Sequence, residues 1–349
     1  METSRIRLYP SGYEVECKTG ETVLSALEQA GYALPNNCRA GACGECKIKV
    51  RSGTFDQGMV LDMALSAEDR AEGYGLMCMA KPTAGVLEIE WGTDDAQPKL
   101  FPPREAVSFV AVDLLKRTSR ILELRLRPLG KPLRYWPGQY VILGDSENEI
   151  PPRAYSIANA PGMDGEIMLQ VSRVDDGTTS QWVHDHLKVG DRVKLSGPYG
   201  TFIGDPSAET PVLCLAAGSG LAPIMALAEA ALARGFRQPV TLLFSAPGES
   251  DVYERGRLAL WQARYRNFRF ITTLTRENSG DYQGRITEIL PGIFPDLTEY
   301  SIYIAGSTAF VEDCIDTVKG LGAREALLHT EGFHRQQSPE SPPAGRLMT

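Results

Sequence analysis

Four cysteines have a spacing that few folds can satisfy. They follow the pattern C-x4-C-x2-C with a distant fourth member, and are Cys38, Cys43, Cys46 and Cys78. Four thiolates, three of them from one tight loop, are the ligand set of a [2Fe–2S] cluster. Gly41 and Gly44 would let backbone N–H groups approach the sulfur atoms, because neither has a Cβ in the way. A structural zinc site is the alternative, although zinc sites usually combine two short pairs of cysteines.

The residues around this loop predict a small α+β domain. A helix is expected over 22–30, with Thr22 as its N-cap. Short strands are expected at 4–9, 13–17, 47–51 and 87–91. With the cysteine spacing, residues 1–96 resemble a plant-type ferredoxin domain, which implies a β-grasp fold.

Negative charge is concentrated in this first part of the chain. Residues 1–96 hold nine Lys/Arg and fifteen Asp/Glu, in a chain of 349 residues with a net charge of −8. Such a balance argues against nucleic acid as a partner. It suits either general solubility or a docking face for a partner protein.

Prolines and charged residues then predict a linker over 97–104. Beyond it, short strands separated by Gly/Pro turns predict an antiparallel β-barrel over 105–206. The expected strands are 106–112, 119–127, 139–144, 154–159, 166–174 and 192–196.

Four short motifs follow one another along the predicted barrel. They are Pro137–Tyr140, Arg153–Ser156, Gly177–Ser180 and Gly197–Phe202. The order resembles the ferredoxin–NADP reductase superfamily and implies an FAD-binding domain. By that resemblance, Arg153 would pair with the flavin pyrophosphate, Tyr155 would lie against the flavin ring, and Ser156 would hydrogen-bond flavin N5.

The third of these motifs predicts a phosphate contact. Its residues, which would begin a helix whose N–H groups face a phosphate, are Gly177, Thr178, Thr179 and Ser180. One departure from the family is visible nearby. Relatives often have a basic residue at Ser172, whereas here the basic residue is its neighbour Arg173, so either one is a candidate for cofactor contact.

From residue 207 to 334 the pattern changes to alternating strands and helices, which predicts an α/β domain with a parallel sheet. The expected strands are 212–216, 240–245, 268–274 and 301–305. Pro211–Ala233 has the length of a membrane span, but its glycines, proline and glutamate favour a strand, a turn and a helix. The turn matches the superfamily's G-x-G-x-x-P motif, in which the nicotinamide dinucleotide would be bound by Gly218, Ser219, Gly220 and Pro223.

The resemblance also suggests where the nicotinamide would lie. Relatives typically have Cys-Gly where this chain has Ala305-Gly306, so Ala305 replaces a thiol beside the nicotinamide. Glu331 and Phe333 resemble the E-x-F terminus of oxygenase reductases, near the contact between flavin and nicotinamide. Ser156 and Glu331 are therefore the candidate catalytic residues.

The coenzyme preference is less sharply indicated. Glu249 and Asp251 are the first charged residues after the second strand of this domain, and they favour NADH over NADPH. Arg255 and Arg257 leave NADPH open.

The order of the three domains resembles the reductase components of bacterial multicomponent oxygenases, with the methane monooxygenase and phenol hydroxylase types closest. It implies an oxidoreductase that passes electrons from NADH through FAD and the [2Fe–2S] cluster to a partner oxygenase. Alternative acceptors are a deoxysugar dehydratase or a desaturase, and the alternative class is a zinc-stabilised binding module fused to a flavin reductase. We expect a cytoplasmic monomer without membrane or nucleic-acid partners, and a disordered tail over 335–349.

Overall fold

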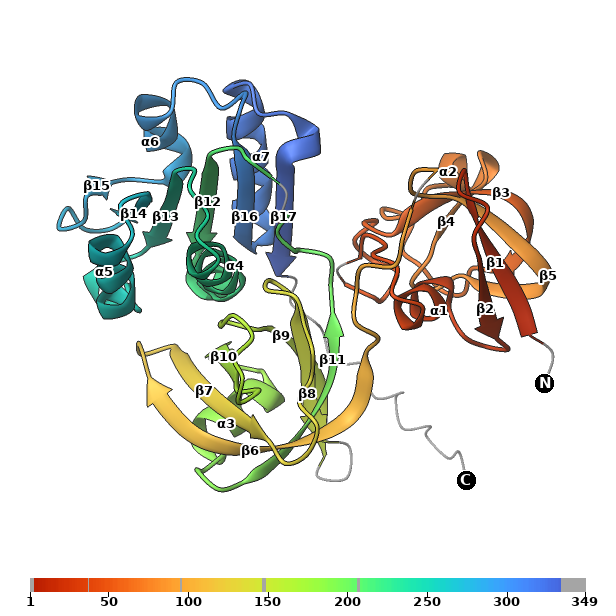
Figure 1. Cartoon of the computed structure of the whole chain (residues 1–349), viewed down its shortest axis with the longest axis horizontal. Helices are drawn as coiled ribbons and strands as arrows, with labels where there is room; N and C mark the ends of the chain where they lie inside the picture. Colours follow the sequence, from red (N-terminus) through yellow and green to blue (C-terminus); the bar gives the residue numbers. More distant parts are fainter. Residues whose placement is uncertain (1–2, 37, 95, 146–148, 206–207, 334–349) are drawn as a thin grey trace, which may run out of the picture.

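The computed structural model describes residues 3–36, 38–94, 96–145, 149–205 and 208–333. Within them the strands form three sheets, one in each expected part of the chain. Figure 1 shows the three units, with the N-terminal unit in red and orange beside the other two. The tail expected over 335–349 lies outside the described residues.

The N-terminal unit has a mixed sheet with strand order β2-β1-β5-β3-β4. Its elements are β1 (Thr3–Tyr9), β2 (Glu14–Lys18), α1 (Val23–Gln29), β3 (Lys47–Asp56), α2 (Ala67–Ala71), β4 (Tyr74–Leu76) and β5 (Lys81–Glu90). β1 pairs antiparallel with β2 and parallel with β5, and apolar residues of α1 pack into the same core. Thr22 caps α1 as predicted, because its Oγ1 accepts a hydrogen bond from the Ser25 N–H at 3.2 Å. The unit has the α+β fold that the ferredoxin resemblance implies.

The second unit is an antiparallel barrel with strand order β10-β7-β6-β11-β8-β9. Its elements are β6 (Arg104–Lys116), β7 (Ile121–Pro128), β8 (Tyr140–Asp145), β9 (Ile150–Ser156), β10 (Ile167–Ser172), α3 (Thr178–Asp185) and β11 (Arg192–Tyr199). An antiparallel bridge between Ile157 and Leu169 joins the two ends of the strand order. The predicted barrel is therefore confirmed.

The third unit has a parallel sheet with strand order β15-β14-β13-β12-β16-β17. The strands are β12 (Val212–Ala217), β13 (Val240–Ala246), β14 (Phe268–Leu274), β15 (Tyr282–Gln283), β16 (Ser301–Ser307) and β17 (Leu328–Phe333). The chain starts at β12, runs outward to β14 and β15, and then returns to the other side of β12. The carboxyl ends of β12 and β16 thus form the switch point at which such sheets bind ligands.

Helices cover both faces of this sheet. They are α4 (Leu221–Ala233), α5 (Arg255–Arg264), α6 (Ile286–Ile293) and α7 (Thr308–Gly320). Alternate residues of the central strands point to opposite faces. Cys214 and Ala216 accordingly pack with α4 and α5, whereas Leu213 and Leu215 pack with α6 and α7.

The segment between the first two units is anchored on both sides. Leu100 is buried, and the N–H groups of Lys99 and Leu100 donate to the Gly31 carbonyl at 2.8 and 2.9 Å. On the barrel side, Phe101 stacks on Trp136 with ring centres 5.6 Å apart, and Trp136 Nε1 donates to the Lys99 carbonyl at 2.8 Å. The expected linker therefore has no regular structure before β6, but it is fixed in place.

Two strands of the N-terminal unit are longer than the sequence predicts. The predicted strand 47–51 is the first half of the ten-residue β3, and β5 begins six residues before the predicted 87–91. Irregular pairing between β3 and β5 breaks the apolar–polar alternation that identifies a strand.

No helix in the described residues is long and apolar enough to cross a membrane. Pro211–Ala233 divides into β12, a turn and α4, as predicted.

Candidate functional site

The four candidate metal ligands come together at one end of the N-terminal unit. Three lie on the loop between α1 and β3, and Cys78 follows β4. Their thiols form two hydrogen-bonded pairs, Cys38 with Cys43 and Cys46 with Cys78. Two pairs fit a two-iron cluster, in which each iron takes two thiolates, better than four thiolates around one zinc ion.

Backbone N–H groups surround the sulfur atoms. Cys38 Sγ accepts from the N–H groups of Ala40, Ala42 and Cys43 at 3.5, 3.4 and 3.3 Å. The Cys43 thiol and these N–H groups lower the pKa of Cys38 to about 5, which favours the thiolate form that binds metal. The Gly41 N–H also donates to Cys78. Gly41 has φ +70°, and a Cβ there would lie 2.8 Å from Val60 Cγ1, so glycine is required at this position.

The expected flavin residues meet at the edge of the barrel. Arg153, Tyr155 and Ser156 lie on β9, and burial raises the pKa of Tyr155 to about 12. Thr179 Oγ1, in the first turn of α3, donates to the Pro151 carbonyl at 2.5 Å and ties the helix start to β9. No side chain caps α3 at Gly177, so its first N–H groups are available to a phosphate. An arginine, an aromatic ring and a helix N-terminus on neighbouring elements suit a flavin and its pyrophosphate.

Several other residues of the flavin motifs have structural partners. Thr178 is the exposed first residue of α3, and Ser180 Oγ donates to the Gly177 carbonyl at 3.0 Å. Arg173 makes two 2.7 Å hydrogen bonds to the Asp185 carboxylate. Ser172 is half-buried at the end of β10. The basic neighbour of Ser172 is therefore engaged with α3 in this structure.

The glycine turn after β12 packs directly against β16. A Cβ on Gly220 would lie 2.1 Å from the Ala305 carbonyl oxygen, so only glycine allows this approach. Gly306 is confined by a side chain, because its Cβ would meet Phe310 Cδ1 at 2.6 Å. Ser219 lies in the same turn, and Pro223 is buried in the first turn of α4. The structure thus places the predicted dinucleotide turn at the switch point of the sheet.

The two candidate catalytic residues meet across the boundary between barrel and parallel sheet. Ser156 lies at the end of β9, and Glu331 lies on β17 opposite Ala305 in the strand pairing. Burial of the Glu331 carboxyl raises its pKa to about 8, and a hydrogen bond with Ser156 opposes this shift. Phe333 follows two residues later, opposite Ser307. A largely protonated carboxyl therefore lies beside a serine hydroxyl at neutral pH.

Comparisons with known proteins agree with this geometry. Residues 6–83 match the 2Fe-2S iron-sulfur cluster binding domain, 107–203 the oxidoreductase FAD-binding domain, and 214–316 the oxidoreductase NAD-binding domain. The aromatic O-demethylase reductase subunit of Amycolatopsis is 35% identical over 332 residues, covering 92% of this chain and 96% of that protein. The chain belongs to the family of iron–sulfur flavoprotein reductase components. The cofactors of this reductase are a [2Fe–2S] cluster, FAD and NAD(P)H, as predicted.

Two further likenesses describe the same family. The solved structure of an Amycolatopsis cytochrome P450 reductase is 32% identical, with a TM-score of 0.85, over 95% of this chain and 99% of that one. A CDP-6-deoxy-L-threo-D-glycero-4-hexulose-3-dehydrase reductase of Yersinia pseudotuberculosis is 28% identical over 94% of this chain and 98% of that protein. This reductase therefore shares its whole domain order with electron-transfer proteins.

Arg39 is a residue of this reductase that was not among the site residues predicted from the sequence. Its guanidinium makes hydrogen bonds of 2.6 and 2.8 Å to the buried carboxylate of Glu28. It also lies 4.6 Å from the centre of the Tyr199 ring, and it is the polar neighbour of the Tyr140 hydroxyl. Tyr140 is opposite Ser156 in the pairing of β8 with β9. An arginine directly after a ligand cysteine, in an acidic domain, is the signal that could have drawn attention to it.

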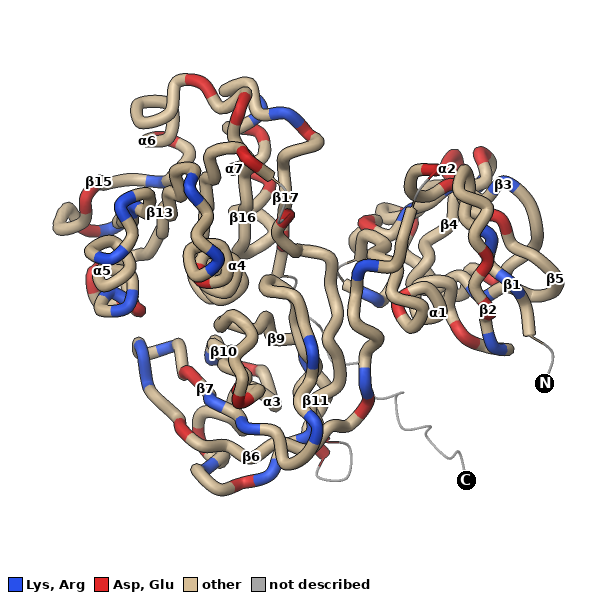
Figure 2. Tube along the Cα trace, in the orientation of Figure 1, with Lys and Arg blue, Asp and Glu red and all other residues tan. Residues whose placement is uncertain are grey.

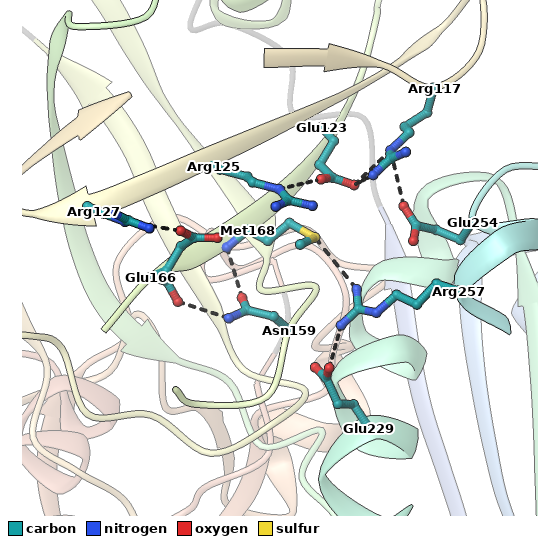
Figure 3. A network of polar contacts seen from close by, with 10 residues as sticks. All are labelled: Arg117, Glu123, Arg125, Arg127, Asn159, Glu166, Met168, Glu229, Glu254 and Arg257. Atoms are coloured by element: carbon teal, nitrogen blue, oxygen red, sulfur yellow. Dashed lines mark hydrogen bonds and ion pairs between the residues drawn. The ribbon is translucent and has the colours of Figure 1, made fainter. Parts of the chain in front are cut away.

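A second unassigned set lies between the barrel and the parallel-sheet unit (Figure 3). The buried Glu123 carboxylate forms ion pairs of 2.8 Å with Arg117 and Arg125, and Arg117 Nε lies 3.2 Å from Glu254 Oε1. Burial raises the pKa of Glu254 to about 7. Burial would also raise the pKa of Glu123, but hydrogen bonds from Glu254, Arg125 and Arg117 outweigh it and lower that pKa. We name these four residues the interdomain clamp.

Proposed function

We propose that this reductase supplies electrons from NADH to a separate oxygenase component, and that it works as a cytoplasmic monomer. The relatives that favour an oxygenase are the aromatic O-demethylase reductase subunit and the cytochrome P450 reductase, at 35% and 32% identity. The dehydrase reductase, at 28%, is less similar. A haem oxygenase acting on an aromatic ether is therefore the acceptor that we favour over a deoxysugar dehydratase.

One observation carries the proposal. Neighbouring residues lead from β17 to the cysteine loop: Glu331 interacts with Ser156, Ser156 is paired with Tyr140 on the adjacent strand, and Tyr140 lies near Arg39, the residue after Cys38. The bound cofactors supply hydride acceptance at the flavin and one-electron transfer at the cluster. The chain's own residues hold the three binding sites in one connected order. Such an arrangement suits conversion of a two-electron donor into single-electron steps.

The flavin and nicotinamide roles follow from position. We assign Arg153 and the first turn of α3, with Gly177–Ser180, to the FAD phosphates, and Tyr155 to the ring. The turn with Gly218, Ser219, Gly220 and Pro223 would bind the dinucleotide phosphates, and Ala305, Gly306 and Phe333 would lie around the nicotinamide. Ser156 and Glu331 would lie where the two rings meet, with Glu331 donating a hydrogen bond while it is protonated.

The preference for NADH is supported by charge at the end of β13. The Glu277 carboxylate accepts a hydrogen bond from the backbone N–H of Glu249 at 2.8 Å, so the acidic Glu277 side chain is held at this turn. The two arginines that left NADPH open form ion pairs instead, Arg255 with Glu249 at 2.7 Å and Arg257 with Glu229 at 2.6 Å. A ribose 2′-hydroxyl suits these surroundings better than a 2′-phosphate does.

The function is tested by NADH-driven reduction of cytochrome c with wild-type protein and with Cys43→Ser. Removal of one ligand thiolate should disrupt the cluster and reduce this activity by at least about tenfold. Reduction of ferricyanide, a small acceptor that the flavin can serve, should stay near the wild-type rate. Full cytochrome c activity in Cys43→Ser would show that electrons do not leave through the cluster.

A further inference from the structure

Three large apolar side chains are exposed on one short segment of the N-terminal unit. Met59 is 88% exposed, Met63 is 87% exposed, and Leu61 between them is 52% exposed. We name Met59, Leu61 and Met63 the methionine surface. Single exposed apolar residues are ordinary, but three within five residues form a patch, and such patches commonly mark contacts with other molecules. Methionine also suits a binding surface because its flexible thioether adapts to different partners.

This surface lies directly on the cysteine loop. The Leu61 N–H donates to the Gly41 carbonyl at 3.0 Å, and the missing Cβ of Gly41 leaves the space that Val60 and the Met59 carbonyl occupy. The segment is thus held against the loop between Cys38 and Cys43. A protein bound here would be separated from the ligand cysteines by little more than one layer of backbone. Electron tunnelling falls steeply with distance, so this is a favourable place for transfer.

Acidic residues flank the methionine surface in the sequence. Residues 56–72 contain five acidic side chains and one arginine, and Figure 2 shows acidic positions gathered around α2. Asp56, Asp62, Glu68 and Glu72 are exposed. An apolar centre with a negative rim is complementary to a protein whose apolar contact area has a basic rim.

The cysteine loop already contacts the barrel through Arg39, which packs against Tyr199. The methionine surface stays exposed with the barrel in place. Two different parts of the loop can therefore be in contact at once, one with the barrel and one with a partner.

We propose that electrons leave this reductase through the methionine surface, to an electron-accepting protein with a basic rim, while the cluster domain stays docked on the barrel. The inference rests on the proposed function and specifies where its partner binds. Arg39 would serve the incoming side of the cluster and the segment 59–63 the outgoing side. The basic haem protein cytochrome c is a suitable probe of this surface.

The test compares Met59→Gln/Met63→Gln with Met163→Gln as the matched control. Met163 is fully exposed on the barrel and distant in sequence from the cysteine loop. The double variant should reduce kcat/KM for cytochrome c by about tenfold. Iron content and ferricyanide reduction should stay at the wild-type level, and Met163→Gln should behave as wild type. Added salt should weaken the cytochrome c reaction of the wild type, because it screens the acidic rim.

The outcomes separate the two proposals. If the double variant keeps the full cytochrome c rate while Cys43→Ser loses it, the methionine surface is not the exit, and the proposed function stands. If Cys43→Ser also keeps the full rate, the cluster is not the exit, and both proposals are overturned.

Discussion

At the scale of single residues, Arg39 has the most connections. Its side chain is bound to Glu28 within its own unit and lies against Tyr140 and Tyr199 of the barrel. Its backbone has φ +55°, a conformation that is uncommon for a residue with a side chain. The residue therefore fixes the cysteine loop to the barrel at the point where the first ligand lies.

Arg39→Lys should slow electron transfer from flavin to cluster. Lysine keeps the positive charge but cannot form two parallel hydrogen bonds to Glu28 or stack its plane on Tyr199. After mixing with NADH, we expect reduction of the cluster to be about fivefold slower and reduction of the flavin to be unchanged. Stopped-flow absorbance at flavin and cluster wavelengths measures both steps. Arg5→Lys, at an exposed ion pair with Glu14, is the control, and an unchanged cluster step in Arg39→Lys would rule out this role.

Glu331 should make the reductase activity depend on pH near pH 8. Burial raises its pKa to about 8, so the carboxyl is protonated at pH 7 and ionised above pH 8. Ionisation removes a hydrogen-bond donor and places a negative charge where the nicotinamide would lie. We expect the rate of flavin reduction by NADH to fall about threefold between pH 7 and 9.

Glu331→Gln tests this assignment, because an amide keeps a donor at every pH. Its rate of flavin reduction should stay level over the same range, in rapid-mixing measurements. Glu325→Gln, whose side chain is 89% exposed, should retain the wild-type profile. A profile with the same inflection in Glu331→Gln would assign the pH dependence to another group.

At the scale of elements, the barrel and the parallel sheet are joined by side chains from a few strand and helix ends. The interdomain clamp connects β6 and β7 with the start of α5, where Glu254 has φ +61°. A cavity of about 510 Å³ lies beside it, lined in part by Arg117, Arg125 and Glu254. Tyr253 lies next to the clamp, with its hydroxyl 2.9 Å from the Gly218 carbonyl and 3.0 Å from Gln170 Oε1. The glycine turn is thereby positioned relative to the barrel.

The clamp should make stability depend on pH. Burial raises the pKa of Glu254 from 4.5 to about 7, so the folded protein holds this proton more tightly than the unfolded chain does. The resulting stability is fully present below about pH 4.5 and is lost as pH rises through about 7, on the order of 3 kcal/mol in total. Glu254→Gln should therefore narrow the difference in thermal midpoint between pH 5.5 and 8.5.

Differential scanning calorimetry at the two pH values measures this effect. Glu299→Gln is the control, because the Glu299 side chain is 74% exposed. Glu331 titrates in the same range, so the comparison rests on the difference between Glu254→Gln and wild type. Equal midpoint shifts in the two proteins would contradict the assignment.

At the scale of the whole molecule, the sequence predicted the parts better than their contacts. The cysteine loop, the β9 motif and the glycine turn are short and local, so their residue types indicate their chemistry directly. The contacts of Arg39 with Tyr199 and of Ser156 with Glu331 join distant parts of the chain. They depend on how the units pack, which no local pattern encodes. The roles of the individual cofactor residues stay predictions, as do the domain boundaries at 96, 104 and 206.

The anchored segment before β6 has a kinetic consequence. Phe101 on Trp136 and the Lys99–Gly31 hydrogen bond hold the chain against both neighbouring units. A flexible tether of the same length would leave the two units to find each other again at each turnover, at an effective concentration in the millimolar range at best. In this structure the N-terminal unit and the barrel are already in contact once the chain has folded. Electron flow within the molecule then depends on chemistry and distance rather than on diffusion, and only delivery to the acceptor remains a bimolecular event.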